Sequence, residues 1–334
     1  MAIDFVIAWV DGSDPEWIKV KEKYQGNAID NENNTTNRYR DWGLLPYWFR
    51  AIETFTPWVN KVHFVTQGHI PSFLKTDAPK LHIVTHKEFI PEEFLPTFSS
   101  HVIEMNLHLI PELSEQFVYF NDDMFILRPM SAEDFFKDGL PCTYGCEVPI
   151  ELIGSIGTWQ HASVNDLGIV NKHFPKKKSV SCHGKKYLDK TYRWKDRLRT
   201  FLLEKLYPDY FTGFKNLHAP ASYLKTTFGE VWDAEPEKLL STCRDRFRSS
   251  DNVNQWVFLW WQIASGQFTP RVIDNIVNIV NDTTVDKMCD IIKGQAHEMI
   301  CLNDPEEEIA FDQLSEMIRG AFETILPNRS SFEK

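Results

Sequence analysis

The chain has 334 residues, of which 43% are hydrophobic, and this is enough to bury a large core in one domain or two closely packed domains. Its formal charge of -11 argues against a protein that grips nucleic acid or an anionic membrane through a broad basic surface, because neutralising phosphates requires clustered Lys and Arg. No apolar run approaches the ~20 residues of a membrane-spanning helix. With no signal peptide recognisable before Asp11, we expect a cytoplasmic protein without an integral membrane segment, which can still contact the inner face of the cell membrane.

Six cysteines in a chain of this length cannot form the dense disulfide framework of a small secreted domain, so we expect free thiols. Cys142, Cys146, Cys182 and His183 offer the ligand types of a zinc site. Their spacing is looser than that of zinc motifs, which makes zinc the weaker interpretation.

The N-terminal half alternates short apolar runs with amphipathic stretches, a pattern typical of an α/β architecture with a mixed sheet flanked by helices. We predict strands at residues 5–10, 61–66, 81–85 and 117–120, and helices at residues 44–55 and 100–109. The polar, Asn-rich residues 25–36 predict a surface loop that could act as a lid.

The strand rhythm fades in the second half, where residues 135–212 predict an insertion on the sheet. Helices are predicted at residues 221–231, 251–264 and 311–326, the second of them capped by Ser249, Ser250 and Asp251. We expect a single domain over residues 1–334, with an α/β core (1–134), an insertion (135–215) and a helical part (216–334).

Residues 172–199 within the insertion are rich in Lys, Arg, His and aromatic side chains. An anionic ligand or a membrane-linked partner could bind there. The alternative is a solvated basic loop and helix, which is how most charge runs behave.

Asn121, Asp122 and Asp123 interrupt the apolar strand predicted at residues 117–120. Adjacent buried carboxylates resist ionisation unless a cation neutralises them, and hard oxygen ligands at a strand end suit Mg²⁺ or Mn²⁺ bridging a pyrophosphate. We therefore predict Asp122 and Asp123 as metal ligands. An ordinary Asn-Asp-Asp turn is the alternative.

The strand predicted at residues 5–10 runs into the segment Trp9-Val10-Asp11-Gly12-Ser13-Asp14. Glycine lets backbone N–H groups approach a phosphate, and carboxylates can bind ribose or a metal. Ligands of open α/β sheets collect beyond the carboxyl ends of strands, so this segment and the Asp pair are the two places where we expect chemistry. A simple turn of Asp, Gly, Ser and Pro is the alternative here.

Two later segments carry side chains suited to group transfer. His218 precedes Ala219 and Pro220, and Arg248 lies three residues before Asp251. A histidine can take a proton from a hydroxyl near neutral pH, and a guanidinium can clamp a phosphoryl group. A packed histidine and a capping salt bridge are the alternatives.

Taken together, these segments resemble the Stealth family of bacterial capsular and exopolysaccharide phosphotransferases, which is similar in its core to the eukaryotic lysosomal-enzyme N-acetylglucosamine-1-phosphotransferase. Four blocks carry the resemblance in order: residues 4–14, about 40–126, 218–220 and 248–255. Residues 301–304 and 327–333 also resemble the tail of the bacterial members. Ala221, which follows the third block, departs from the family pattern and leaves the acceptor contacts unassigned.

The resemblance implies a glycosyltransferase-A-like, Rossmann-like fold, with donor and metal bound by residues 1–134 and acceptor contacts in residues 135–215. It implies transfer of a sugar-1-phosphate from a UDP-sugar to a hydroxyl of a glycan acceptor, which could be lipid-linked, with UMP leaving. A divalent metal, Mg²⁺ or Mn²⁺, is implied near Asp122 and Asp123. The implied catalytic residues are His218, Arg248, Asp123 and Asp251, and the implied donor-binding residues are Trp9, Val10, Asp11, Gly12, Asp14, Arg40, Arg50, Asn121 and Asn303.

The expected reaction is in-line attack by an acceptor hydroxyl on the phosphorus that bears the sugar, with His218 as base and Arg248 on the phosphates. A conventional metal-dependent glycosyltransferase would use the same donor but release UDP. A polysaccharide-binding protein without activity is a third interpretation, favoured by the eleven Trp residues.

Overall fold

The computed structural model describes residues 2–25, 40–152, 154, 156–304 and 310–334. From residue 26 on, the loop predicted at residues 25–36 lies outside the described residues.

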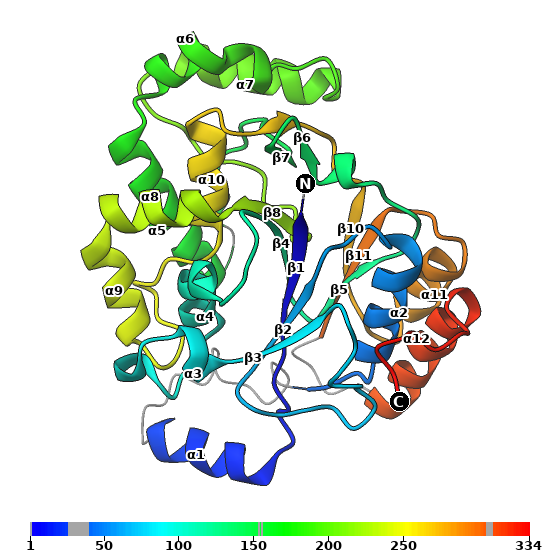
Figure 1. The fold of residues 1–334 in the computed structure, drawn as a ribbon. Helices are drawn as coiled ribbons and strands as arrows, with labels where there is room; N and C mark the ends of the chain where they lie inside the picture. Colours follow the sequence, from blue (N-terminus) through cyan, green and yellow to red (C-terminus); the bar gives the residue numbers. More distant parts are fainter. Residues whose placement is uncertain (1, 26–39, 153, 155, 305–309) are drawn as a thin grey trace.

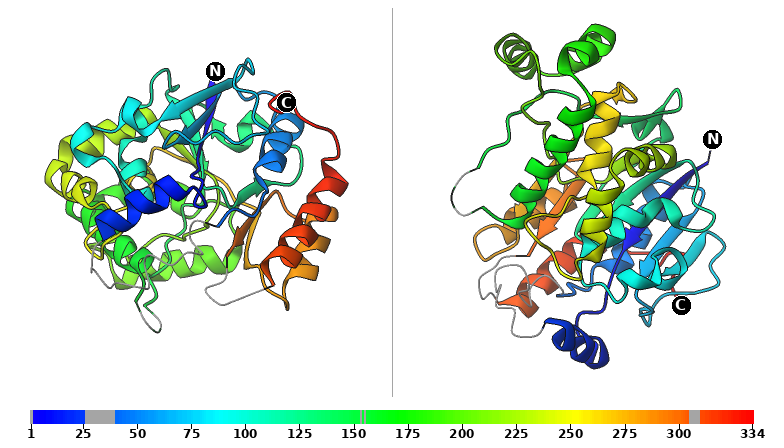
Figure 2. Two further views of the ribbon diagram at one scale, coloured as in Figure 1. Left: turned by 90° about the horizontal axis from the view of Figure 1, so that it is seen from below. Right: turned by 90° about the vertical axis from the view of Figure 1, so that its left-hand side faces the viewer.

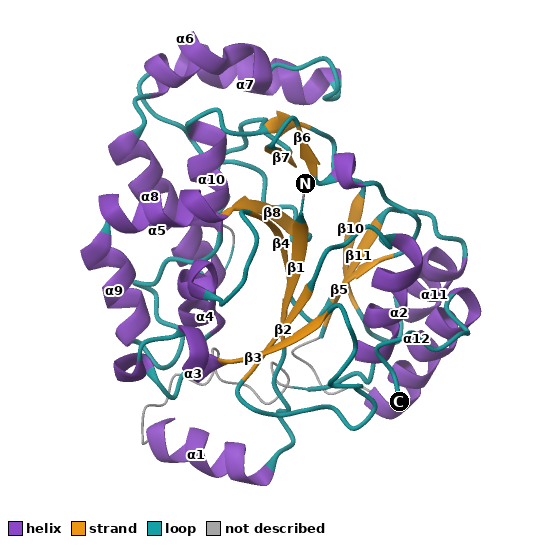
Figure 3. Ribbon diagram, viewed as in Figure 1, coloured by secondary structure: helices purple, strands orange, loops and turns teal. Residues whose placement is uncertain are grey.

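A five-stranded sheet lies at the centre of the molecule (Figures 1 and 3). Its strands are β1 (Ile3–Ala8), β2 (Val62–Thr66), β3 (Leu81–Thr85), β4 (Gln116–Phe120) and β8 (Ala221–Leu224), in the order β3-β2-β1-β4-β8. The first four strands are parallel, and β8 runs antiparallel to β4. The carboxyl ends of β1 and β4 therefore meet at one edge of the sheet.

Helices cover both faces of this sheet (Figures 1 and 2). On one side lie α2 (Leu45–Phe55), α11 (Val285–Lys293) and α12 (Phe311–Ile325), and on the other lie α4 (Ser100–Asn106), α8 (Lys225–Ala234), α9 (Pro236–Arg244) and α10 (Trp256–Ala264). Because side chains alternate along a strand, Phe5 and Ile7 of β1 pack on the first side and Val6 packs on the second. The prediction of a mixed α/β fold flanked by helices is confirmed.

Two smaller sheets complete the core. β5 (Met124–Ile126) pairs with β11 (Met299–Asn303), which pairs with β10 (Asn275–Ile279). β7 (Leu140–Thr143) lies between β6 (Phe136–Lys137) and β9 (Thr269–Pro270). Since β5 follows Asp123 directly, its pairing with β11 holds the Asp pair in place, and the Leu302 N–H donates to the Asp123 carbonyl oxygen at 2.9 Å.

The remaining helices lie around the rim. α1 (Pro15–Gln25) and α6 (Lys176–Tyr187) with α7 (Trp194–Leu206) lie at opposite ends of the molecule in Figures 1 and 2. α5 (Thr158–His173) packs along α10, and α3 (His86–Phe89) follows β3. Short 3₁₀ turns occupy Glu92–Phe94, Leu107–Leu109 and Ala132–Asp134.

Two predicted helix starts are wrong. Residues 221–224 of the helix predicted at 221–231 form strand β8, where Tyr223 lies opposite Phe117 of β4, and the helix begins at Lys225. Four residues are too few to show whether side chains repeat with the period of a strand or of a helix. The pairing of residues 221–224 with β4 decides that they form a strand. The N-cap predicted at Ser249–Asp251 is also wrong, because α10 begins at Trp256. The residue just before this helix, Gln255, donates its backbone N–H to the carboxylate of the buried Glu104.

The predicted helical character of residues 216–334 is incomplete, since this part supplies four strands, β8 to β11. Two of them pair with strands of residues 1–134, β8 with β4 and β11 with β5. The short strands β6 and β7 also lie within the predicted insertion. Among the described residues, no helix is both long and apolar enough to cross a membrane.

All six cysteines are free thiols, as predicted. The zinc interpretation finds no support, because Cys142, Cys146, Cys182 and His183 do not come together as a ligand cluster. In the part of the chain that the structure describes, the cluster with metal-ligand chemistry is formed by Asp123, His218 and Cys301.

Candidate active site

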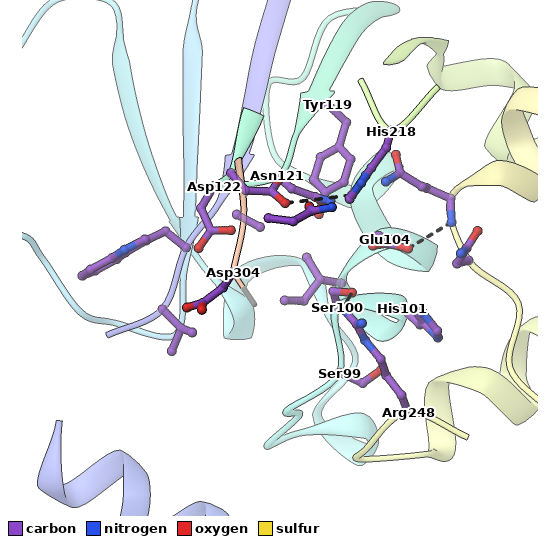
Figure 4. A pocket seen from close by; sticks show the side chains of 18 of the residues that line it. Ser99, Ser100, His101, Glu104, Tyr119, Asn121, Asp122, His218, Arg248 and Asp304 are labelled. Carbon is purple, nitrogen blue, oxygen red and sulfur yellow. Dashed lines mark hydrogen bonds and ion pairs between the residues drawn. The ribbon is translucent and has the colours of Figure 1, made fainter. Parts of the chain in front are cut away.

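A cavity of about 990 Å³ opens beyond the carboxyl ends of β1 and β4. Ala8, Trp9 and Val10 line it at the end of β1, and Asn121, Asp122 and Asp123 line it after β4. Figure 4 shows Asn121 and Asp122 among the side chains around it. Its volume lies at the upper end of the range for small-molecule and cofactor sites. The two segments in which the sequence predicts chemistry thus share one cavity, as the parallel pairing of β1 and β4 requires.

The Asp pair sits in a turn between two strands. The Met124 N–H donates to the Asn121 carbonyl oxygen at 3.2 Å, which turns the chain so that Asp122 and Asp123 precede β5. Asp122 is exposed to the cavity, but desolvation by the surrounding walls raises its pKa to about 7, with further contributions from the charges of Asp123 and Asp41. Burial also raises the pKa of Asp123, while His218 acts in the opposite direction. Two carboxyl groups so placed are poised to accept a positive partner.

His218 faces this pair from the loop that precedes β8. Its Nε2 lies 3.9 Å from Asp123 Oδ2 (Figure 4). The residue has a φ of 41°, in the left-handed region that non-glycine residues rarely adopt. Asn216 accepts its backbone N–H at 2.9 Å, and Asn275 donates to its carbonyl oxygen at 3.1 Å, so both neighbours hold this strained conformation.

Strand β11 packs beside His218 through its residue Cys301. Cys301 Sγ lies 3.7 Å from His218 Nδ1 and 3.3 Å from Asn303 Oδ1. Burial, together with the negative charges of Asp123 and Asp122, raises the pKa of the Cys301 thiol well above its ordinary value. A raised pKa makes this thiol a poor nucleophile, and its sulfur is a soft ligand that hard cations such as Mg²⁺ and Mn²⁺ do not prefer.

Arg248 lies on the opposite wall, where it donates to Ser100 Oγ at 2.7 Å (Figure 4). Behind it the fully enclosed Glu104 accepts the Gln255 N–H at 3.0 Å. Burial raises the pKa of Glu104, although the guanidinium of Arg248 and the bond from Gln255 oppose this. Arg248 makes a single described bond and lines the cavity, so its other N–H groups can reach an anionic ligand.

A third wall joins the start of α2 to the end of β11. Arg40 Nε lies 3.5 Å from Asp304 Oδ2, and Trp42 Nε1 donates to the same oxygen at 3.3 Å. Arg40, Asp41, Trp42, Asn303 and Asp304 all line the cavity. This wall places a cation, two carboxylates and an aromatic ring near the Asp pair.

Comparisons with known proteins identify the family of this chain. Residues 1–28 match the family model of Stealth protein CR1, conserved region 1, and residues 38–142 match Stealth protein CR2, conserved region 2. A capsular polysaccharide phosphotransferase, WcwK of Streptococcus pneumoniae, is 40% identical over 99% of this chain and 98% of its own length. The chain belongs to the Stealth family. The predicted resemblance is thereby confirmed.

Other Stealth relatives match over the same length. The receptor polysaccharide phosphotransferase WefC of Streptococcus gordonii is 37% identical over 99% of this chain and 98% of its own. The exopolysaccharide phosphotransferase cps2G of Lactiplantibacillus plantarum is 35% identical over 99% of this chain and 96% of its own. Since these relatives are phosphotransferases, this Stealth protein is an enzyme of the transferase class.

Among solved structures, the galactosyltransferase LgtC in complex with donor and acceptor sugar analogs covers 95% of each chain at 10% identity, with a TM-score of 0.36. That score is too low for any inference from LgtC to this Stealth protein.

Most of the predicted site residues of this Stealth protein come together in the cavity. Those that line it are Trp9, Val10, Arg40, Asn121, Asp122, Asp123, His218, Arg248 and Asn303. They come from segments more than 200 residues apart, and only the folded sheet brings them together.

Five predicted residues lie outside the set that lines the cavity: Asp11, Gly12, Asp14, Arg50 and Asp251. Asp14 accepts the Trp17 N–H at 2.7 Å at the start of α1, and Asp11 accepts the Ser13 N–H at 2.9 Å, so both carboxylates serve turns. Arg50 is buried and forms a fork with Glu333, and Asp251 is exposed. Their predicted roles in donor binding and catalysis have no support in this geometry.

Several cavity residues were not predicted from the sequence: Trp17, Asp41, Trp42, Tyr119, Trp159 and Asn254. Asp41 and Trp42 follow Arg40 directly in the sequence. Their position beside an arginine predicted to bind the donor was the signal that could have identified them as cavity residues. Trp159 lies in the first turn of α5 and is 52% exposed. No local pattern distinguishes it from the other tryptophans.

Proposed function

We propose that this Stealth protein transfers a sugar-1-phosphate from a UDP-sugar to a hydroxyl of a glycan acceptor, releases UMP and so acts in capsule or cell-surface polysaccharide synthesis. The observation that carries the proposal is the convergence of Asp122, Asp123, His218 and Arg248 on one cavity of about 990 Å³. Carboxylates, a histidine and an arginine around one cavity are the tools of phosphoryl transfer. The naming of the relatives as polysaccharide phosphotransferases agrees with it.

The donor set of the Asp pair fits a divalent cation such as Mg²⁺ or Mn²⁺. Asp123 Oδ1 is buried and has no hydrogen-bond partner among the described residues, while the Asp123 side chain stays 26% exposed toward the cavity. Carboxylate oxygens are the ligands that these hard cations prefer, whereas the Cys301 sulfur is a soft ligand. Asp122 and Asp123 would hold the cation, which when bound neutralises charge on the diphosphate.

The donor would lie along the cavity with its uracil and ribose near Trp9 and Val10. Arg40 and Asn303 on the third wall would bind its polar groups, and Arg248 would bind the transferred phosphoryl group from the opposite wall. Trp159 at the start of α5 presents a half-exposed ring to the cavity, and such a ring can pack against an acceptor sugar. Donor and acceptor thus approach from different walls.

His218 would act as the general base. Its Nε2 would take the proton from the acceptor hydroxyl while that oxygen forms a bond to the phosphorus that bears the sugar. The bond from this phosphorus to the bridging oxygen breaks, and UMP leaves with the electron pair. The bond between the sugar and its own phosphate oxygen stays intact. Asp123, 3.9 Å from Nε2, stabilises the imidazolium that results.

The nucleotide product tests the proposal. We expect UMP, detected by mass spectrometry, when the protein is incubated with a panel of UDP-sugars, Mn²⁺ and a glycan acceptor. Release of UDP would identify a conventional glycosyltransferase instead, and the proposal would be wrong. Absence of turnover with every donor, acceptor and metal would favour a binding protein.

A further inference from the structure

The pair of helices α6 and α7 forms one end of the molecule, away from α1 (Figures 1 and 2). The pair is tied to the body from below. Lys176 of α6 is buried and its Nζ lies 2.6 Å from Glu147 Oε2, and the Tyr187 hydroxyl donates to the Ile263 carbonyl oxygen at 2.9 Å. On α7, by contrast, several large apolar side chains are exposed to solvent.

Helix α7 has two faces of different kind. Its inner face reaches the body through the buried side chains of Thr200 and Leu203, and the Thr200 hydroxyl accepts the Glu147 N–H at 3.1 Å. Its outer face, which we call the α7 outer face, consists of five exposed apolar side chains: Trp194 (67% exposed), Leu198 (48%), Phe201 (44%), Leu202 (49%) and Leu206 (70%).

The spacing of the α7 outer face follows the helical repeat. Its members stand at positions i, i+4, i+7, i+8 and i+12, so they form one stripe along the helix. On an ordinary surface helix such a stripe faces the core, whereas on α7 it faces away from the core. Of the eighteen large apolar side chains that are exposed among the described residues, seven lie between positions 194 and 210. A cluster of this kind marks a contact surface.

Positive charge surrounds the stripe. Residues 172–210 hold twelve Lys and Arg against four Asp and Glu, in a chain whose net charge is -11. The exposed basic side chains of residues 176–206 are Lys177, Lys178, Lys185, Lys190, Arg193, Lys195, Arg197 and Lys205, of which Lys177 pairs with Asp209 and Lys205 pairs with Glu204 at 3.0 Å. Lys195 Nζ lies 5.7 Å from the Trp194 ring and Lys205 Nζ lies 5.3 Å from the Phe201 ring, so both stems run beside apolar side chains of the stripe.

We propose that the α7 outer face docks the protein on an anionic lipid bilayer. The apolar stripe would enter the boundary between headgroups and acyl chains, and the bordering Lys and Arg would meet the negative headgroups. A second copy of the chain fits less well, because a two-fold contact through this face would set the same basic surface against itself.

Docking by α7 would leave the cavity facing away from the bilayer. α5 begins at Thr158, which lines the cavity, and ends at His173, three residues before α6. This helix of 16 residues is about 24 Å long, and it separates the two surfaces. The docking surface is therefore distinct from the candidate active site, and the proposal does not depend on which nucleotide is released.

Vesicle sedimentation of the full chain tests the proposal. We expect the protein to sediment with vesicles of phosphatidylcholine that contain phosphatidylglycerol, and to stay in the supernatant with phosphatidylcholine alone. Phe201→Ser combined with Leu202→Ser should lower the partition coefficient by at least about tenfold, because each side chain loses its burial in the bilayer. The control, Ile70→Ser combined with Leu109→Ser, changes two apolar side chains of similar exposure (43% and 46%) outside residues 172–210 and should bind like the parent.

Electrostatic contributions are separated by Lys195→Glu combined with Arg197→Glu, which should lower binding to the anionic vesicles and leave thermal unfolding unchanged. Equal binding of the parent and the Phe201/Leu202 variant would overturn the proposal. The proposal would also be overturned if the parent protein is a dimer in solution, the Phe201/Leu202 variant is a monomer, and neither binds vesicles. In that case the α7 outer face would be a contact with a second copy of the chain. Because all six substituted positions, those of the control included, are exposed, each variant is expected to fold.

Discussion

At the scale of single residues, the candidate site works by setting unlike charges close together in a partly enclosed cavity. Among the described residues, His218 faces the Asp pair as a group that can become positive, with its Nε2 3.9 Å from Asp123 Oδ2. Arg248 stands on the far wall with Ser100 as its partner. Donor phosphates would thus lie between two positive regions, one at the Asp pair when it holds a cation and one at Arg248.

Replacement of His218 tests its role as base. His218→Asn suits the backbone better than alanine, because asparagine tolerates the φ of 41°. We expect kcat to fall by about 10²- to 10⁴-fold while UDP-sugar affinity, measured by calorimetry, stays at the parent value. His161→Asn, on α5 and outside the residues that line the cavity, is the control and should keep full activity. Parent-like turnover of His218→Asn would remove the histidine from the mechanism.

Replacement of Asp123 tests the metal assignment. Asp123→Asn keeps the shape of the side chain and removes its charge, so metal-dependent activity should be lost and nucleotide affinity in the presence of Mn²⁺ should weaken by about tenfold or more. Titration calorimetry with and without Mn²⁺ measures both effects. Asp134, which lies outside the cavity and pairs with Arg271, offers the matched control Asp134→Asn. Normal affinity of Asp123→Asn for the metal and nucleotide together would contradict the assignment.

The Arg248 guanidinium should not be replaceable by an ammonium group. Lysine keeps the charge but cannot bind Ser100 and a phosphoryl group with separate N–H donors of one planar group. We expect Arg248→Lys to lower kcat/KM by about 10- to 100-fold. Arg246→Lys is the matched control, since Arg246 donates to the Pro96 carbonyl oxygen and lies outside the cavity lining. Equal losses in both variants would indicate a structural role for Arg248.

At the scale of elements, the C-terminal residues are fixed by a buried ion pair. Arg50 of α2 donates to both carboxylate oxygens of Glu333, at 2.9 and 3.0 Å, and Phe332 packs into the core. Burial acts to raise the pKa of Glu333, but the bonds from Arg50 and Ser330 outweigh it and leave the pKa below its ordinary value. The arginine predicted for donor binding therefore anchors the tail instead.

This ion pair predicts a pH-dependent stability. The pKa of Glu333 is lower in the folded than in the unfolded state, so its contribution is complete above the unfolded value and is lost as pH falls through the folded value. Glu333→Gln should lower the free energy of unfolding by about 3 kcal/mol at pH 7, and the deficit should shrink below about pH 4. Urea denaturation at both pH values measures it.

The matched control for this prediction is the other acidic partner of Arg50. The Glu323 side chain is 49% exposed, so Glu323→Gln should cost less than about 1 kcal/mol. A deficit of Glu333→Gln that does not change with pH would show that the lost packing, and not the ion pair, is responsible.

At the scale of the whole molecule, the two halves of the chain share their sheets. β8 completes the central sheet beside β4, and β11 covers β5 directly behind the Asp pair. The side chains that line the cavity come from both halves as well. The active site therefore depends on a structure that neither half can form alone.

A fragment experiment follows from this arrangement. Residues 1–215 expressed alone would expose the paired edges of β4 and β5 and the core face covered by α10 to α12, so we expect no cooperative unfolding transition in urea. The full chain under the same conditions is the control and should unfold cooperatively. A folded, cooperative fragment would show that residues 1–134 and the insertion form an independent domain, against the prediction of a single one.

The sequence by itself determined the elements whose signal is local. The apolar runs of β1 to β4 and the polar interruption at Asn121 to Asp123 could be read from neighbouring residues, because strand period and turn chemistry act over a few positions. The order of the blocks identified the family. Only the tertiary structure decided that Asp122, His218 and Arg248 share a cavity, that Arg50 and Asp251 do not, and that residues 221–224 form a strand. Each of these features depends on contacts between segments that are far apart in the sequence, and the pattern of neighbouring residues does not encode the free energy of such contacts.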